Sequence, residues 1–170
     1  MRRSFLTLIV GLAVVAAACT STPSGSGTDE APQGDPAPTA SFVMFDGSTA
    51  TLADYQGRPV VVNFWASWCP SCVAEMSAAF KPAQEQLGDQ VAFLGMNLQD
   101  DRERALSLVE ETGVLFDLGE DQTGELYLEF GGIGMPFTAF IDAEGNVVKD
   151  HNGPLSEQQL VELIQETLLP

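Results

Sequence analysis

Two cysteines, Cys69 and Cys72, stand where the residue pattern changes from that of a strand to that of a helix. The preceding run, Val60 to Trp65, consists of β-branched and aromatic residues with one Asn and without Gly or Pro, as in a buried strand. Helical spacing begins at Ser71, so Cys69 should lie at a helix start, where unpaired N–H groups and the helix dipole favour negative charge. Such an environment lowers the pKa of a thiol and makes it a nucleophile. Cys72, one turn later, can attack a mixed disulfide formed on Cys69, so the pair is predicted to be a redox-active dithiol.

The overall composition is that of one folded and strongly acidic domain. The chain has 170 residues, of which 45% are hydrophobic, and this is enough for a core. Its formal charge of −17 would repel phosphates, so we expect no nucleic-acid partner. Two thiols without nearby histidines cannot complete a tetrahedral zinc site, and we expect neither a metal nor any cofactor besides the cysteine pair itself.

Residues 1–18 have the features of an export signal peptide. Arg2 and Arg3 precede an apolar run, Phe5 to Ala18, that is too short to span a bilayer comfortably. Cys19 follows three alanines and resembles the lipidated cysteine of bacterial lipoproteins, although such signals usually have Leu where this chain has Ala16. We expect cleavage before Cys19 and lipidation of its sulfur. Ordinary signal cleavage near the alanines and an uncleaved anchor are the alternatives, and the pattern does not separate general secretion from twin-arginine export.

Residues 19–40 are predicted to be a flexible linker between this lipid anchor and the domain. The segment after Cys19 is rich in small and polar residues and has no large apolar side chain, so it cannot bury enough surface to order itself. A flexible coil of about 20 residues would hold the domain on the order of 25 Å from its anchor. The folded domain is then expected to span residues 41–170.

Strand and helix patterns alternate over this domain, as in an α/β fold. We predict strands over residues 42–45, 48–52, 60–65, 91–97, 114–117, 137–142 and 147–152, of which the first two form a hairpin. We predict helices over residues 71–87, 101–112, 123–130 and 156–169, and a kink or break in the first of them near Phe80 and Lys81 because of Pro82. Asp100 should cap the second helix, with Leu106 and Val109 facing inward, and Ser156 and Gln159 should form a capping box. Helical crossovers imply a sheet covered on both faces, with the cysteines at the carboxyl end of a central strand, where open α/β sheets bind ligands.

The run Trp68-Cys69-Pro70-Ser71-Cys72 after a buried strand, together with Met135-Pro136-Phe137 at the start of a later strand, resembles the thioredoxin fold. Over about residues 41–169 the chain is similar, more narrowly, to the membrane-attached, extracytoplasmic TlpA/ResA-like thiol–disulfide oxidoreductases, which include the cytochrome c maturation reductases. The resemblance implies a central mixed sheet flanked by helices, with an N-terminal β-hairpin and a central insertion around residues 105–130. It also implies a monomer that acts on protein thiols and disulfides and takes electrons from a membrane-embedded thiol carrier.

The same resemblance implies roles for individual residues. Cys69 would be the exposed attacking thiolate and Cys72 the buried resolving thiol. Pro136 would be a cis-proline opposite the pair, with Met135 offering backbone hydrogen bonds to an extended substrate; the alternative is a proline that merely opens a strand. The expected substrate surface further includes Trp68 and Pro70.

A carboxyl group is expected beside the dithiol. Glu75, three residues after Cys72, matches a glutamate of these relatives, whereas Asn63 stands where thioredoxin has a buried aspartate. A carboxylate there could take or return the proton of the resolving thiol, and its charge would raise the pKa of a nearby thiol. The alternative is a first-turn glutamate that is favoured only by the helix dipole.

The expected function is disulfide exchange on exported proteins, in the reducing direction, at the extracytoplasmic face of a bacterial cell membrane. Without lipidation the protein would instead be secreted or periplasmic. A disulfide-forming oxidase is the main alternative, because residue patterns do not determine a reduction potential. A peroxidase lacks support, since the Thr-x-x-Cys pattern of peroxiredoxins is absent. A copper-handling or binding lipoprotein that keeps the fold is the non-enzymatic alternative.

Overall fold

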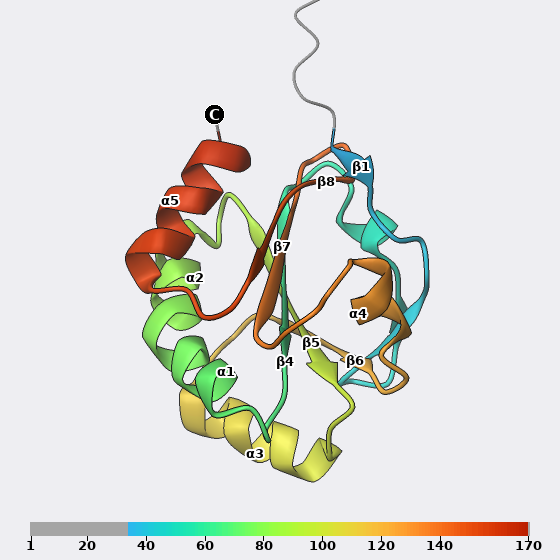
Figure 1. The fold of residues 1–170 in the computed structure, drawn as a ribbon, viewed down its shortest axis with the longest axis vertical. Helices are drawn as coiled ribbons and strands as arrows, with labels where there is room; N and C mark the ends of the chain where they lie inside the picture. The colour runs from blue at the N-terminus through green and yellow to red at the C-terminus, as the bar shows by residue number, and fades with distance from the viewer. Residues whose placement is uncertain (1–33, 170) are drawn as a thin grey trace, which may run out of the picture. The chain divides into compact units, whose positions relative to one another are not determined.

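The computed structural model describes residues 34–169, so Cys19 and the expected signal peptide lie outside the described part. Its strands form one sheet in the order β1-β8-β7-β4-β5-β6-β2-β3 (Figure 1). The strands are β1 (Asp35–Pro36), β2 (Phe42–Met44), β3 (Thr49–Ala50), β4 (Val60–Trp65), β5 (Ala92–Leu98), β6 (Asp117–Asp121), β7 (Phe137–Ile141) and β8 (Asn146–Asn152). The helices are α1 (Pro70–Glu75), α2 (Lys81–Leu87), α3 (Arg102–Thr112), α4 (Glu125–Glu129) and α5 (Glu157–Thr167), with a 3₁₀ turn at Leu52–Tyr55 and a π turn at Met76–Phe80.

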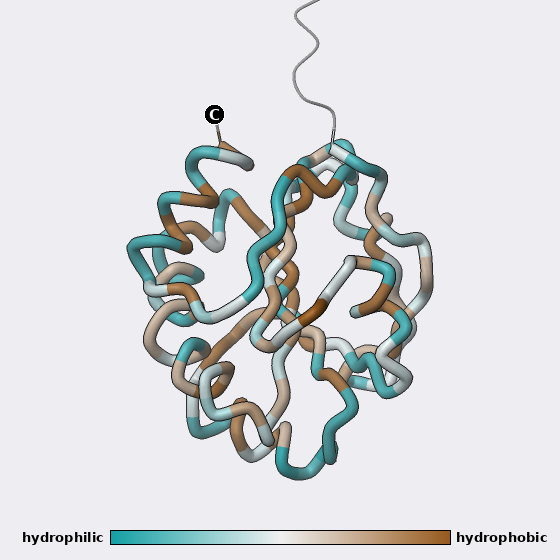
Figure 2. The backbone as a smooth tube through the Cα atoms, in the orientation of Figure 1, coloured by the Kyte–Doolittle hydropathy of each residue, from teal (hydrophilic) through white to brown (hydrophobic). Residues whose placement is uncertain are grey.

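Strand β4 lies in the middle of the sheet, and all its residues are buried. It pairs in parallel with β5 and antiparallel with β7. Successive side chains point to opposite faces, so Val61 and Trp65 join the core under α1, α2 and α5, while Val62 and Phe64 join the core on the side of α4. Figure 2 shows the hydrophobic residues concentrated along these central strands. A mixed sheet with helices on both faces confirms the predicted fold class.

The helix after the cysteines is not broken at Pro82. Its first turns, α1, pass into the π turn Met76–Phe80, and α2 follows directly, with Pro82 in its first turn. A proline in a continuous α-helix would clash with the carbonyl group four residues earlier, and a π turn at that place relieves the clash. The expected kink or break near Phe80 is therefore replaced by a local widening of the helix.

Three expectations about the segment from β5 to β6 are wrong in detail. Asp101 caps α3 by accepting a hydrogen bond from the backbone N–H of Arg104, whereas Asp100 bonds elsewhere. Leu106 is 40% exposed, whereas Val109 packs against the core as predicted, and Ala105 is fully buried. The strand expected over residues 114–117 begins instead at Asp117, because the apolar residues that suggested it belong to a loop packed into the core.

The folded domain starts earlier than the predicted boundary at residue 41. Strand β1 pairs with β8, where Asp35 is opposite Val147, and the N–H of Ala37 donates to the carbonyl of Gly145 at 2.9 Å. Backbone pairing at a sheet edge needs no apolar side chain, which is why composition placed residues 35–37 in the linker. The rest of the predicted linker, like the lipid anchor, lies mostly outside the described residues and stays a prediction.

Other local expectations are confirmed. Strands β2 and β3 form the hairpin, and Ser156 and Gln159 make the reciprocal bonds of a capping box at the start of α5. Gly113 ends α3 with a left-handed conformation, φ 68°. Within residues 34–169, no helix has the length and hydrophobicity that crossing a membrane would require.

Candidate functional site

Cys69 and Cys72 form a disulfide at the carboxyl end of β4. Cys69 is the N-cap residue of α1, and its Sγ accepts a hydrogen bond from the backbone N–H of Cys72 at 3.3 Å. Pro70 occupies the first turn, where its missing N–H costs nothing and its fixed φ suits a helix. The strand thus ends where the helix begins, and the predicted position of the sulfur at the helix start is realised.

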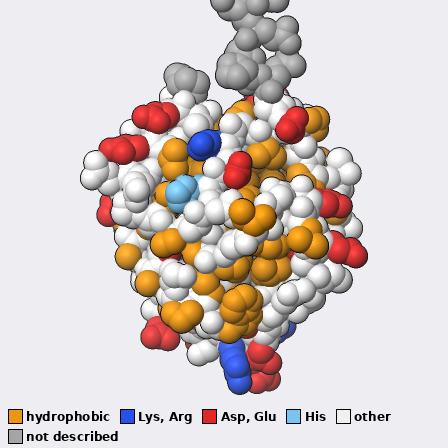
Figure 3. All heavy atoms as spheres, in the orientation of Figure 1, with side chains coloured by type: hydrophobic (Ala, Val, Ile, Leu, Met, Phe, Trp, Pro, Cys, Tyr) orange, Lys and Arg blue, Asp and Glu red, His pale blue; other side chains and the backbone are white. Residues whose placement is uncertain are grey.

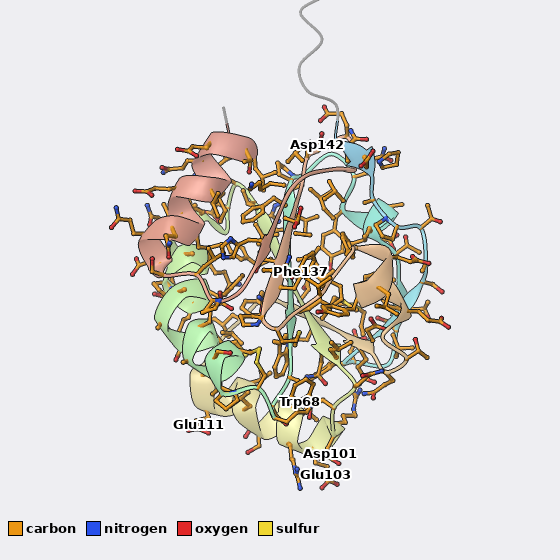
Figure 4. The ribbon with its side chains drawn as sticks, viewed as in Figure 1. Trp68, Asp101, Glu103, Glu111, Phe137 and Asp142 are labelled. Carbon is orange, nitrogen blue, oxygen red and sulfur yellow. A yellow bond between two sulfur atoms is a disulfide. The ribbon has the colours of Figure 1, made fainter. Side chains whose placement is uncertain are left out.

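The two cysteines differ in access to solvent. Cys69 retains 5% of its surface and Cys72 retains none, so Cys69 is much less exposed than expected but is still the accessible member of the pair. Trp68, directly before it, is 54% exposed. Figure 4 shows Trp68 at the end of the molecule where α3 begins.

Asp100 holds the loop before Cys69 through contacts that the sequence analysis did not predict. The Asp100 carboxylate accepts hydrogen bonds from the backbone N–H and the hydroxyl of Ser67, at 2.5 and 2.7 Å, and from the side chain of Asn97 at 2.9 Å. The indole N–H of Trp68 donates to the carbonyl of Gln99 at 3.2 Å. Although burial opposes ionisation, the hydrogen bonds from Ser67 and Asn97 outweigh it and place the pKa of Asp100 below its ordinary value. An acidic residue just after a buried strand was the available signal, but it was interpreted only as a helix cap.

The Met135–Pro136 peptide bond is cis, as predicted. Phe137, the next residue, pairs with Phe64 in the antiparallel register of β7 and β4. Pro136 therefore lies at the same end of the sheet as the loop that carries the cysteines. Pro136 is buried, whereas Met135 is only half-buried and makes no backbone hydrogen bond within the described residues.

An exposed apolar residue that was not predicted precedes this bond. Ile133 is 88% exposed and stands between two glycines in the segment that leads to Met135. Its side chain is one of the few large hydrophobic groups left to solvent, together with Trp68. In Figure 3, hydrophobic side chains reach the surface in the middle and the lower part of the face shown, while most of the acidic groups lie toward its rim.

Glu75 is buried beneath this end of the sheet, with 3% of its surface exposed. Its Oε1 accepts a hydrogen bond from the backbone N–H of Leu155 at 2.6 Å, while Oε2 has no partner within the described structure. Burial raises the pKa of Glu75 from an ordinary 4.5 to about 7, and the N–H of Leu155 and the side-chain amide of Asn63 partly oppose this shift. The carboxyl group is therefore poised to exchange a proton near neutral pH.

No metal-binding cluster accompanies these groups. Within residues 34–169, no three His, Cys, Asp or Glu side chains come together as ligands would. The chemistry that the described site offers is that of two sulfurs and one buried carboxyl group.

The sequence model of the redoxin family matches residues 32–164. The chain belongs to this family. Among curated relatives, it is 40% identical over 103 residues to the thiol:disulfide interchange protein DsbE of Escherichia coli (strain K12). The matched region covers 59% of this chain and 53% of that protein. The chain is 36% identical over 126 residues to DsbE of Pseudomonas fluorescens biotype C, which covers 73% of this chain and 68% of that protein. The chain thus spans about half the length of the Escherichia coli relative.

A solved structure has a similar fold. The crystal structure of a thiol:disulfide interchange protein of the thioredoxin family from Chlorobium tepidum superposes with a TM-score of 0.67 at 28% identity, over 79% of this redoxin and 97% of that chain. The thioredoxin-like fold predicted from the cysteine motif and the later proline is therefore shown by both sequence and structure.

Proposed function

We propose that this redoxin is a thiol–disulfide oxidoreductase that acts on exported proteins through Cys69 and Cys72, and that it works as a reductase. The observation that carries the proposal is the disulfide at the start of α1, in which only Cys69 keeps access to solvent. The names of its relatives in Escherichia coli and Pseudomonas fluorescens, both thiol:disulfide interchange proteins, support the same reaction class.

The proposed reaction begins with the reduced dithiol. The Cys69 thiolate attacks a substrate disulfide, one substrate sulfur leaves as a thiolate, and a mixed disulfide joins Cys69 to the other. Cys72 then loses its proton and attacks the Cys69 sulfur, which restores the Cys69–Cys72 disulfide and releases the second substrate thiol. Two electrons pass from the dithiol to the substrate, and two protons end on the substrate thiols. A reduced partner thiol returns the pair to its starting state.

Glu75 supports the second step of this scheme. It lies one helical turn from Cys72, and a carboxyl group with a pKa of about 7 can accept the proton that the resolving thiol must lose. Its burial argues against the alternative in which Glu75 only complements the helix dipole from the helix surface.

The substrate would bind across the loop of Trp68 and the segment of Met135. Met135 has backbone groups that the described structure leaves without backbone partners, so they are available to an extended peptide. Trp68 and Ile133 add exposed apolar surface to these two segments. We propose protein thiols and disulfides as substrates, with a membrane-embedded thiol carrier as the electron source.

The proposed location is the extracytoplasmic face of a bacterial membrane. The export signal over residues 1–18 and lipidation of Cys19 would place the domain there on a flexible linker. Mass spectrometry of the protein purified from its host membrane tests this, because a diacylglycerol-bearing Cys19 at the mature N-terminus is expected. An unmodified N-terminus near the alanines would leave a secreted or periplasmic protein.

A trapping experiment tests the reaction. The Cys72→Ser variant should accumulate mixed disulfides between Cys69 and exported proteins that dissociate on reduction, whereas Cys69→Ser should accumulate none. Equal trapping by the two variants would contradict the assignment of Cys69 as attacking residue. The reduction potential tests the direction: a value near that of thioredoxin, about −270 mV, is expected, and a value near about −120 mV would indicate a disulfide-forming oxidase.

A further inference from the structure

Two buried oxygen atoms beside the dithiol have no hydrogen-bond partner in the described structure. They are Oδ1 of Asn63, on β4, and Oε2 of Glu75, on α1. Asn63 is 1% exposed and Glu75 is 3% exposed, so water does not cover either group. An unpartnered buried polar atom destabilises a fold. Two such atoms on neighbouring side chains therefore need a physical explanation.

Both side chains are buried on the side of the sheet that α1 covers. Residues 61, 63 and 65 of β4 point to the sheet face that α1 covers, and Glu75 points back to this face. The side-chain amide of Asn63 acts to lower the pKa of Glu75, which places the two groups close together, although Asn63 Oδ1 and Glu75 Oε2 both lack a partner in the described structure. The other carboxyl oxygen, Oε1, is already occupied by the N–H of Leu155.

A third side chain completes the cluster and can both donate and accept. Asn63 Nδ2 donates to Oγ1 of Thr138 at 3.2 Å, and Thr138, opposite Asn63 on β7, is fully buried. A threonine hydroxyl has one donor hydrogen and two lone pairs. Thr138 can therefore remain a partner of the Asn63 amide whichever end of the amide it meets.

We propose that Asn63 is a positioning residue whose side-chain amide rotates, so that Oδ1 and Nδ2 exchange places, according to the protonation state of Glu75. When Glu75 is protonated, its O–H donates to Asn63 Oδ1, while Asn63 Nδ2 donates to Thr138. When Glu75 is ionised, Nδ2 donates to the carboxylate, while the Thr138 hydroxyl donates to Oδ1. Both orphaned oxygens gain partners in either state, and no charge is added to the core.

The consequence for catalysis rests on the proposed function of the dithiol. Glu75 can receive the proton of Cys72 only if the protein accommodates both forms of the carboxyl group without a large penalty. A hydrogen bond to a charged group contributes more to stability than one between neutral groups, so the amide stabilises the ionised form more. Asn63 would thereby keep the proton affinity of the buried carboxyl group within the neutral range.

Within residues 34–169, no charged side chain is among the causes that shift the pKa of Glu75. The cysteines on the same helix do not titrate while they form the disulfide, and Thr138 and Leu155 are neutral. His151 on β8 lies opposite Thr138 in the strand register and is half-buried, which makes it the titratable side chain to control for.

The experiment follows carboxyl carbon resonances by NMR in the oxidised protein, with the Glu75 signal assigned by its loss in Glu75→Gln. Asn63→Leu, which keeps a similar size but has no polar atom, should raise the titration midpoint of Glu75 by about one pH unit, a tenfold gain in proton affinity. His151→Gln should leave the midpoint unchanged. A change of less than about twofold in Asn63→Leu would overturn the proposal.

A second measurement does not depend on the stability of a variant. In the wild-type protein, the side-chain amide resonances of Asn63 should shift with the same midpoint as the Glu75 carboxyl carbon, because the amide changes partners with ionisation. Asn63 amide resonances that do not shift through this titration would contradict the proposed rotation of the amide. Both readouts use the oxidised protein without substrate, so their failure would leave the trapping experiment and the proposed reaction unaffected.

Discussion

At the scale of the residue, burial separates groups that the sequence presents as similar. Of the two cysteines only Cys69 keeps any exposed surface, in agreement with its proposed role as the attacking residue. Among the many acids, Glu75 has its pKa raised to about 7 by burial, while Asp100 has its pKa held below the ordinary value by the hydrogen bonds around it. One carboxyl group can therefore carry a proton at neutral pH, and the other serves as a fixed anion.

The raised pKa of Glu75 predicts a specific pH dependence of stability. Between pH 4.5 and about 7 the unfolded chain releases this proton and the folded protein keeps it, so stability falls as pH rises through this window. The total loss from this group should be about 3 kcal/mol, because each pKa unit corresponds to about 1.4 kcal/mol.

Urea unfolding of the wild-type protein and of Glu75→Gln, at a series of pH values, measures this effect. The difference between the two unfolding free energies isolates Glu75 from the other acids, since the glutamine stays neutral. A difference that does not vary between pH 4.5 and 7.5 would show that the carboxyl group titrates at its ordinary pKa.

At the scale of the element, the end of β5 positions the loop that carries the cysteines. The carboxylate of Asp100 binds both polar groups of Ser67, and the carbonyl of Gln99 receives the indole N–H of Trp68. The active-site loop is therefore attached to the neighbouring strand and not only to its own helix. The end of β5 therefore helps to determine where Cys69 lies.

Asp100→Asn should weaken this attachment. The amide replaces one acceptor oxygen by a donor group, so one hydrogen bond from Ser67 is lost and unfolding should become easier by about 1–3 kcal/mol. Asp101→Asn is the matched control, because asparagine caps a helix about as well as aspartate. Equal stabilities of the two variants in urea would show that the Ser67 contacts contribute little.

Close packing under β4 explains a glycine inside β5. A Cβ atom at Gly95 would lie 2.7 Å from Cε2 of Phe116 and 2.9 Å from Nε1 of Trp65, both in the buried core. Gly95→Ala should therefore destabilise the fold by about 1–3 kcal/mol through overpacking. Gly134→Ala, where a Cβ meets nothing within 4 Å, is the control, and thermal unfolding measures both. Similar losses in the two variants would argue against the steric cause.

At the scale of the whole molecule, the dominant property is the formal charge of −17. Ion pairs between side chains of the described domain are few; Lys81 with Glu85 and Arg102 with Glu120 are the ones found there. Most of the negative charge therefore repels itself across the surface, which favours solubility but opposes compactness.

This repulsion predicts that salt stabilises the protein at neutral pH. As the NaCl concentration rises from about 10 to 150 mM, the screening length falls from about 30 to 8 Å, and the melting temperature should rise. Near pH 4 many of the acids are protonated, so the same salt series should have a much smaller effect. A melting temperature that is independent of salt at pH 7 would indicate that the charges are compensated in a way that the described ion pairs do not reveal.

The sequence by itself determined the class of fold, the helix start at the cysteines and the identity of the central strand. These follow from local physics: a continuous run of β-branched and aromatic residues, Gly at a helix end, and the capping pair of Ser156 and Gln159. The cis bond at Met135-Pro136 was also predicted, although through a family resemblance and not through periodicity.

Only the tertiary structure decided which polar groups meet. The Asp100–Ser67 contact and the cluster of Asn63, Glu75 and Thr138 join residues far apart in the chain, and no local pattern predicts such contacts. The pairing of β1 with β8 and the core packing of the loop before β6 were missed for the same reason. Burial, hydrogen bonding and pKa depend on neighbours in space, so the burial and the raised pKa of Glu75 became visible only once the helix and the sheet were packed together.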